Sequence, residues 1–193
     1  MEVFGGSAWS LPLPLGVHVG GGDTRFTAHY STRPFEDAPY YAYRVGRASV
    51  GRAFELELVH HKLYLENPRP PVEDLQISHG YNLAMANFVP AGRDWRWRYG
   101  VGIVVAHPEG RVGGRSVGRL ATLLGGGYHI AGIASQIAVG RRYALGKGAI
   151  AMTGSPEFAL TAAMARIRID GGVLTVPNVA IHALGGLGVR RRW

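Results

Sequence analysis

The sequence predicts an all-β protein: a closed antiparallel transmembrane β-barrel of eight strands, with ten strands as the alternative. Three observations favour this fold class. Apolar and polar residues alternate with a period of two along most of the 193 residues, whereas the 3.6-residue period of an amphipathic helix is hard to find. Gly, Pro and Asp interrupt the alternation where turns are expected. No stretch reaches the ~18 consecutive apolar residues that a membrane-spanning helix needs.

Nine segments have the alternation of strands. Turn sequences separate them, among them NPRPP and the DGG at 170–172, whose Asp-Gly pair is typical of a tight hairpin. A single-chain membrane barrel has an even number of strands, so one segment should lie outside the barrel, and we expect it to be the first or 148–169. The expected strands are residues 2–10, 23–33, 40–49, 52–66, 73–87, 93–107, 128–142, 148–169 and 173–193.

Two segments break the alternation. In 148–169 the apolar positions Phe158 to Met164 give way to Ile167 and Ile169 on the opposite parity, which predicts a β-bulge near Ala165. Residues 111–127 have no period, and their Gly and Arg content is typical of a long surface loop.

Length and composition indicate one domain, residues 1–193, since no linker divides the chain. The net charge of +8 comes from scattered arginines that often alternate with apolar residues and form no basic helix face. Lipid phosphates are an equally good anionic partner for them, and we expect no nucleic-acid partner. The lack of Cys excludes disulfides and thiolate metal sites, and no nucleotide-binding glycine motif is present, so no cofactor is expected. The segment MEVFGGSAWS does not resemble a signal peptide; an exported protein would carry one ahead of it.

Each predicted strand has one apolar and one polar face. Trp95 to Val105, Phe54 to Leu58, and Tyr81 to Met85 supply apolar positions, and the aromatic residues gather toward strand ends, as in the interfacial girdles of membrane barrels. The polar faces carry charges of both signs, which can pair inside a narrow barrel. We therefore expect the apolar face to point outward to lipid; a soluble barrel with that face inward around a ligand is the alternative from another class.

The C-terminal segment alternates apolar and small residues up to a final aromatic residue, through Val179, Ile181, Ala183, Leu187, Val189 and Trp193. This pattern resembles the last strand of small bacterial outer-membrane β-barrel proteins. The resemblance implies a Gram-negative outer-membrane location and recognition by the outer-membrane assembly machinery. Trp193 replaces the phenylalanine that is usual there, and Arg191 lies on the apolar parity.

The polar faces predict a charged network inside the barrel. An eight-stranded barrel is just wide enough for side chains to fill, so we expect these charges to pair and to plug the lumen. The expected members are Arg25, Arg44, Glu55, Glu57, Arg96 and Arg98.

A hairpin through NPRPP would place His61 opposite Ser78, and Glu57 opposite Asn82. Ser78, His61 and Glu57 are therefore candidates for a hydrolytic set of nucleophile, base and orienting carboxylate. The other interpretation is a polar interior that satisfies its own hydrogen bonds, and we favour it, because a slip in register removes the pair.

The same hairpin would pair His60 with His79 on the apolar face, with Lys62 and Tyr81 nearby, as a contact for lipid or a protein partner. In size the chain is similar to the lipid A deacylases, whose catalytic Ser and His face lipid in a His-x-Ser motif. Here Ser78 and His79 are adjacent and point to opposite faces, so no catalytic residue is carried over. His60 and His61 diverge in the same way, and no metal site is expected.

The predicted function is that of a small, plugged outer-membrane barrel with a structural or interaction role toward lipopolysaccharide or a protein partner. An outer-membrane lipid hydrolase is the second hypothesis. A narrow solute channel is the third, and it would need Gly80, Ala84, Gly100 and Gly102 to leave a continuous water path.

Overall fold

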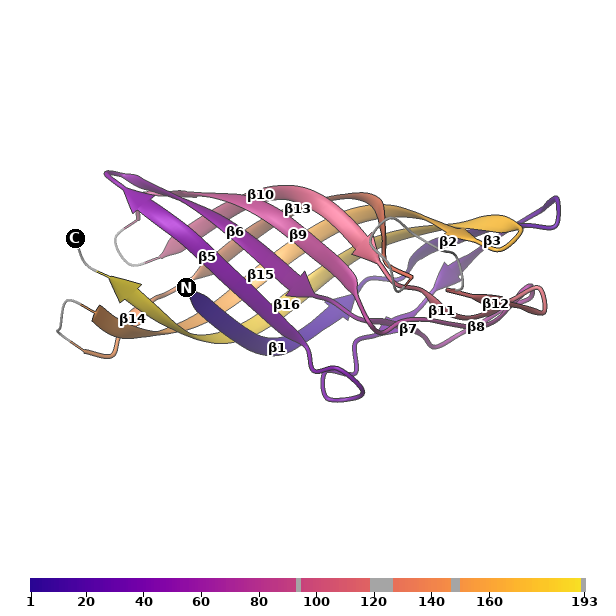
Figure 1. Cartoon of the computed structure of the whole chain (residues 1–193), viewed down its shortest axis with the longest axis horizontal. Helices are drawn as coiled ribbons and strands as arrows, with labels where there is room; N and C mark the ends of the chain where they lie inside the picture. The colour runs from indigo at the N-terminus through magenta and orange to yellow at the C-terminus, as the bar shows by residue number, and fades with distance from the viewer. Residues whose placement is uncertain (93–94, 119–126, 147–149, 192–193) are drawn as a thin grey trace.

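A closed ring of eight antiparallel strands forms the body of the molecule (Figure 1). The computed structural model describes residues 1–92, 95–118, 127–146 and 150–191, with the backbone alone at Arg191. Each ring strand pairs with the next, and β16 pairs with β1 to close the ring. In ring order the strands are β1 (Glu2–Ser10), β5 (Tyr41–Ser49), β6 (Arg52–His60), β9 (Tyr81–Pro90), β10 (Arg96–Ala106), β13 (His129–Gly140), β15 (Ile150–Ile169) and β16 (Gly172–Arg191).

The remaining strands lie mostly beyond one end of the ring, on the right in Figure 1. We call this part the distal extension, and the opposite end of the ring, where β1 begins and β16 ends, the terminal end. In the extension β2 (Leu13–Val19) and β3 (Gly22–Ala28) form a hairpin against β16, and a five-stranded sheet joins β12 (Arg115–Val117), β11 (Glu109–Val112), β8 (Val72–Ile77), β7 (Leu63–Leu65) and β4 (Tyr30–Ser31). The short β14 (Tyr143–Ala144) pairs with β15.

The all-β prediction is confirmed, and the described residues contain no helix that is long and apolar enough to cross a membrane. The extra segment among the nine is 23–33, because β3 pairs only with β2, outside the ring. The expectation that 2–10 or 148–169 would be the extra one is wrong. Pro12 and Pro14 hid β2, since a residue without an N–H is uncommon in strands.

Two predicted strands are divided where the chain leaves the ring: 52–66 becomes β6 and β7, and 73–87 becomes β8 and the start of β9. Part of the predicted loop at 111–127 is also strand, because Gly113 and Gly114, both with positive φ, form the tight turn between β11 and β12. The rest of that prediction, 119–126, lies outside the described residues.

The apolar face of the ring points outward. Neighbouring positions on successive strands form a row of large apolar side chains that are all substantially exposed, so the interpretation with the apolar face inward is wrong for the ring. The row does not return to its starting point, which is the stagger expected of tilted strands in a closed sheet. Its members are Trp9, Ile181, Leu160, Ile137, Tyr99, Phe88 and Phe54, and it ends at Arg47.

The polarity of the two faces inverts toward the distal extension, as β15 shows most clearly. Up to Met164 its large apolar residues are exposed on the outside of the ring; beyond that point Arg166 and Arg168 are exposed, and Ile167 and Ile169 are buried inside. The pairing of β15 with β16 is continuous across this change, so the predicted bulge near Ala165 is wrong. The irregularity in the ring lies instead between β10 and β13, at Val104 and Val105.

The same inversion corrects the predicted orientation of β9. Leu83 and Met85 are buried on the inner face of the ring, whereas Ala84 and Ala86 lie on the outer face. The apolar parity of this segment points inward because its first half lines the distal extension, which has an apolar core. That core includes Leu15, Leu63, Leu75, Ile77, Val104, Ile167, Leu174 and Val176.

Candidate functional site

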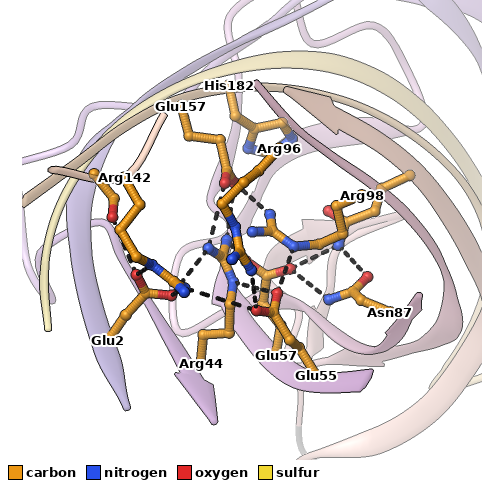
Figure 2. A network of polar contacts seen from close by, with 12 residues as sticks. Glu2, Arg44, Glu55, Glu57, Asn87, Arg96, Arg98, Arg142, Glu157 and His182 are labelled. Atoms are coloured by element: carbon orange, nitrogen blue, oxygen red, sulfur yellow. Dashed lines mark hydrogen bonds and ion pairs between the residues drawn. The ribbon is translucent and has the colours of Figure 1, made fainter. Parts of the chain in front are cut away.

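The interior of the ring at the terminal end holds a network of charged side chains (Figure 2). Arg44 of β5 lies at its centre: its Nη2 donates to Glu57 Oε1 at 2.5 Å and to Glu157 Oε1 at 2.8 Å. Arg98 of β10 donates through Nε to Glu55 Oε2 at 2.9 Å and through Nη1 to Glu157 Oε1 at 2.6 Å. Four strands, β5, β6, β10 and β15, are thereby tied together across the interior of the ring.

Two further pairs extend the network toward the terminal end. Arg96 Nη2 donates to Glu55 Oε1 at 2.9 Å, and Arg142 makes a two-bond contact with Glu2 at 2.9 and 2.6 Å. The network therefore contains four arginines and four glutamates, so its formal charges balance. They are Arg44, Arg96, Arg98, Arg142, Glu2, Glu55, Glu57 and Glu157.

Two amides fill the remaining space beside the charges. Asn87 Nδ2 donates to Glu57 Oε2 at 2.9 Å, and Gln136 Nε2 donates to the same oxygen at 2.6 Å. A Cβ at Gly100 would overlap both amide side chains, so they occupy the space left by this glycine. The idea that Gly100 and its neighbours leave an open water path is therefore wrong at this level of the ring.

The structure brings together five of the six residues expected in the lumen. Arg25 is the exception: it is exposed on β3, outside the ring, because the segment that carries it is not a ring strand. Sequence reasoning missed Glu2, Arg142 and Glu157. Glu157 had a signal, since it lies on the parity opposite to Phe158 and Leu160.

A layer of uncharged polar side chains lies next along the interior. The rings of His61 and His182 are 5.1 Å apart. His182 shares hydrogen bonds with the Tyr40 hydroxyl and, at 2.8 Å, with Thr161 Oγ1, and His61 Nε2 lies 3.1 Å from Asn178 Oδ1. Beyond this layer begins the apolar core of the distal extension. The interior is thus filled in three successive layers: charged, neutral polar and apolar.

The predicted hydrolytic set is not assembled. The β6–β9 register pairs Glu57 with Met85 in place of Asn82, because the hairpin is divided between β6–β9 and β7–β8. His61 is completely buried and hydrogen-bonded to Asn178. Glu57 is held by Arg44, and Ser78 Oγ donates to Glu109 Oε2 at 3.0 Å. The three candidates therefore belong to three different contacts.

A smaller polar cluster surrounds Ser78 at the base of the extension. His79 Nδ1 lies 3.2 Å from the same Glu109 oxygen and 3.4 Å from Ser78 Oγ. The ring of His107 is tilted by 42° against that of His79, with the ring centroids 5.4 Å apart. Ser78 and Glu109 approach the same ring nitrogen of His79. A relay from serine to carboxylate needs opposite nitrogens of the imidazole, so this geometry does not form one.

The residues expected to contact lipid or a partner have different surroundings. Lys62 is completely buried, and its Nζ donates to the backbone oxygens of Arg33, Glu36 and Ala38. Tyr81 is also completely buried and donates to Val176 O at 2.8 Å. Neither side chain is available for lipid or a partner, so the expected contact is wrong for both.

The two histidines of that set do not face each other. His60 is stacked on Tyr41 with ring centroids 4.8 Å apart, and its Nδ1 lies 2.8 Å from Asn82 Oδ1. His79 is half exposed beside Glu109. The expected pair is absent because the chain leaves the ring after His60 and returns to it only at Tyr81.

Several hollows open on the described surface, and three of them bear on the site. The first, of about 1140 Å³, lies at the terminal end over the charged network, with Arg142, Arg190 and Glu2 among its lining residues. The second, of about 700 Å³, lies over β5, β6, β9 and β10. The third, of about 520 Å³, includes Arg25 and Arg166. In the described part of the chain, no three His, Asp or Glu side chains are placed to hold a metal ion.

Comparisons with known proteins add little. No protein-family model matches the chain, and no curated protein matches it either. The chain is similar to a Neisserial surface protein. The crystal structure of Neisserial surface protein A matches over 96% of this chain and 94% of that chain, with a TM-score of 0.40 and 9% sequence identity. So distant a likeness carries no argument, and the function of this chain has to be inferred from its own geometry.

Proposed function

We propose that the chain is a transmembrane β-barrel protein of the Gram-negative outer membrane, with a plugged lumen and a structural or interaction role. The observation that carries this proposal is the polarity of the ring, which is apolar outside and charged inside. An exposed apolar row around a closed ring is what a lipid-facing surface requires, and a closed ring leaves no unpaired strand edge in lipid.

The inversion of polarity along β15 supports the same proposal. In water a strand buries its apolar face, as β15 does at Ile167 and Ile169; in lipid it exposes that face, as β15 does at Leu160 and Met164. The six shorter ring strands have 9 to 12 residues, close to the ~9 to 11 that a tilted strand needs to span a bilayer. The distal extension would then stand in the aqueous phase.

Lipopolysaccharide is the partner we propose for the distal rim of the ring. Arg166 and Arg168 are the first outward positions on β15 beyond Met164, and both are exposed. Arg25 lines a hollow together with Arg166. Arginines directly above an apolar surface would meet the phosphates of a lipid headgroup. A protein partner would bind the same extension.

Recognition by the outer-membrane assembly machinery is proposed for β16. Ile181, Leu187 and Val189 alternate outward and are exposed. The final aromatic residue of the pattern, Trp193, lies outside the described residues. Neither a hydrolase nor a channel is favoured by an observation, since the hydrolytic set is not assembled and side chains fill the lumen.

The first experiment is refolding of the chain into detergent micelles beside a detergent-free control. We expect β-rich circular dichroism only in micelles, and faster migration on SDS gels for the unheated sample than for the heated one, because the closed ring resists SDS until it is heated. A monodisperse, folded protein without detergent would overturn the proposal.

A further inference from the structure

We propose that the hollow over β5, β6, β9 and β10 binds one acyl chain of an anionic glycerophospholipid, with the lipid phosphate held by Arg47 and Arg52. This inference rests on the proposed function, because it requires the ring to stand in a bilayer. It assigns a lipid site at the end of the ring opposite to the lipopolysaccharide contact.

The hollow is a groove in the outer apolar surface. Leu56, Ala86 and Val101 are cross-strand neighbours, so a small side chain lies between two large ones and forms the floor of the groove. Its volume of about 700 Å³ falls within the ~300 to 1,000 Å³ of ligand pockets. Ala86 is exposed at this floor, and nothing in the described chain covers it.

Aromatic side chains form the wall of the groove on the side of the terminal end. Phe54 and Phe88 pack with ring centroids 5.6 Å apart, and Tyr99 continues the same row on β10. Val45 lines the groove on β5. Inward positions border it from behind the outer side chains, namely Gly46, Glu55, Asn87, Gly100 and Gln136. The open surface of the groove is hydrocarbon over almost its whole extent, which selects an apolar occupant such as an acyl chain.

Two arginines lie where this groove meets the terminal end. Arg47 lines the groove and lies opposite Phe54, and Arg52 lies opposite Ser49 in the next row. Arg47 follows the outward Val45 by two positions and Arg52 precedes the outward Phe54 by two, so both arginines lie on the outer face, and both are exposed. Within the described residues neither has a carboxylate partner, whereas the arginines of the lumen are balanced by four glutamates.

These observations together select the class of ligand. An apolar groove continuous with a lipid-facing surface takes a chain that is already in the bilayer. Two guanidinium groups at the edge of that surface, with no carboxylate partner among the described residues, take a phosphate. Charge complementarity thus favours phosphatidylglycerol over a zwitterionic lipid. A second copy of the protein, seated on the same apolar surface, is the competing occupant.

The test is native mass spectrometry of the protein refolded in micelles that contain phosphatidylglycerol, with phosphatidylcholine as the neutral comparison. We expect wild type to retain one phosphatidylglycerol in preference to phosphatidylcholine. Ala86→Phe, which fills the groove, and the double variant Arg47→Gln/Arg52→Gln should each lower retention about tenfold.

Matched controls separate the groove from a general effect on the surface. Ala162→Phe places the same bulk at an exposed outward alanine of β15, in the same row of the ring, and Arg69→Gln/Arg111→Gln removes two exposed arginines of the distal extension that belong to neither proposed lipid contact. Both controls should retain lipid as wild type does. Gel migration that depends on heating shows for each variant that the ring has formed.

Several outcomes would overturn the inference. Unchanged retention in Ala86→Phe, equal loss in Ala162→Phe, or a protein dimer in place of a lipid adduct would each do so. A wild type that folds in micelles yet retains no phosphatidylglycerol would remove this inference alone. Folding without micelles would remove the proposed function as well.

Discussion

Arg96 and Arg98 show how burial sets the contribution of a charged residue to the stability of the ring. They lie two positions apart on the inner face of β10 and share Glu55 as a partner. The side chain of Arg98 is 3% exposed and also binds Glu157, whereas that of Arg96 is 28% exposed and lies nearer the open terminal end. The alternation in the sequence groups the two residues, but only the depth of each in the ring distinguishes them.

We therefore expect Arg98→Met to destabilise the protein by ~3 to 5 kcal/mol, because it removes a buried guanidinium that binds both Glu55 and Glu157 and leaves the buried network with an excess negative charge. Arg96→Met, the matched control, should cost about 1 kcal/mol, since water can reach that end of the network. Guanidinium unfolding in one detergent, followed by tryptophan fluorescence, measures both. Equal losses would show that the network does not depend on the depth of its members.

The residues of the site could be predicted from the sequence only where their strands belong to the ring. Period-two alternation places Arg44, Glu55 and Glu57 on one inner face, and there the charges do meet. Arg25 follows the same alternation, but its strand forms part of a hairpin outside the ring. The predicted pairing of Ser78 with His61 is wrong for a related reason. The predicted hairpin is divided, and its two halves pair in different sheets.

At the scale of the element, β15 shows one strand in two environments. Its apolar positions change parity after Met164. In a strand that meets a single solvent along its whole length, such a change would require a bulge. The structure has no bulge there: the strand stays regular, and its surroundings change instead. A change of parity in a long strand can therefore indicate the edge of a membrane.

Charge substitutions along the outer face of β15 test this explanation. Leu160→Arg should cost ~2 to 4 kcal/mol, because it places a charge toward the hydrocarbon of the bilayer. Arg168→Leu, beyond the inversion, should change stability by less than ~0.5 kcal/mol, as an exposed surface substitution does. Unfolding of the protein in lipid vesicles gives both values. A similar cost at the two positions would contradict the placement of the membrane edge.

At the scale of the whole molecule, the interior is closed by successive layers of different chemistry. Charged pairs fill the terminal end, His61 and His182 follow, and the apolar core of the extension seals the distal end. The charged layer excludes ions because fixed ion pairs occupy its space. The apolar core excludes them because it offers no polar group to replace their hydration. The interior is therefore closed along its length, and under the proposed function the extension would stand beyond the membrane.

We accordingly expect vesicles containing the protein to remain impermeable to small sugars. Swelling in an isotonic sugar solution measures the permeability, with protein-free vesicles as the baseline. Arg98→Met should not open a path, because the histidine layer and the apolar core remain in place. Rapid swelling with the wild-type protein would contradict the plugged interior and restore the channel hypothesis.

The sequence by itself determined that the chain is built of strands, that these strands have one apolar and one polar face, and that a tight turn lies at Asp170 and Gly171, because these features depend on neighbours within a few residues. Only the tertiary structure decided which strands close the ring and which face of each strand points outward at each level. The reason is physical: alternation specifies two faces but not the medium that each one meets. That medium is set by strand pairing between distant residues, as the opposite orientations of apolar positions on β9 and β10 show.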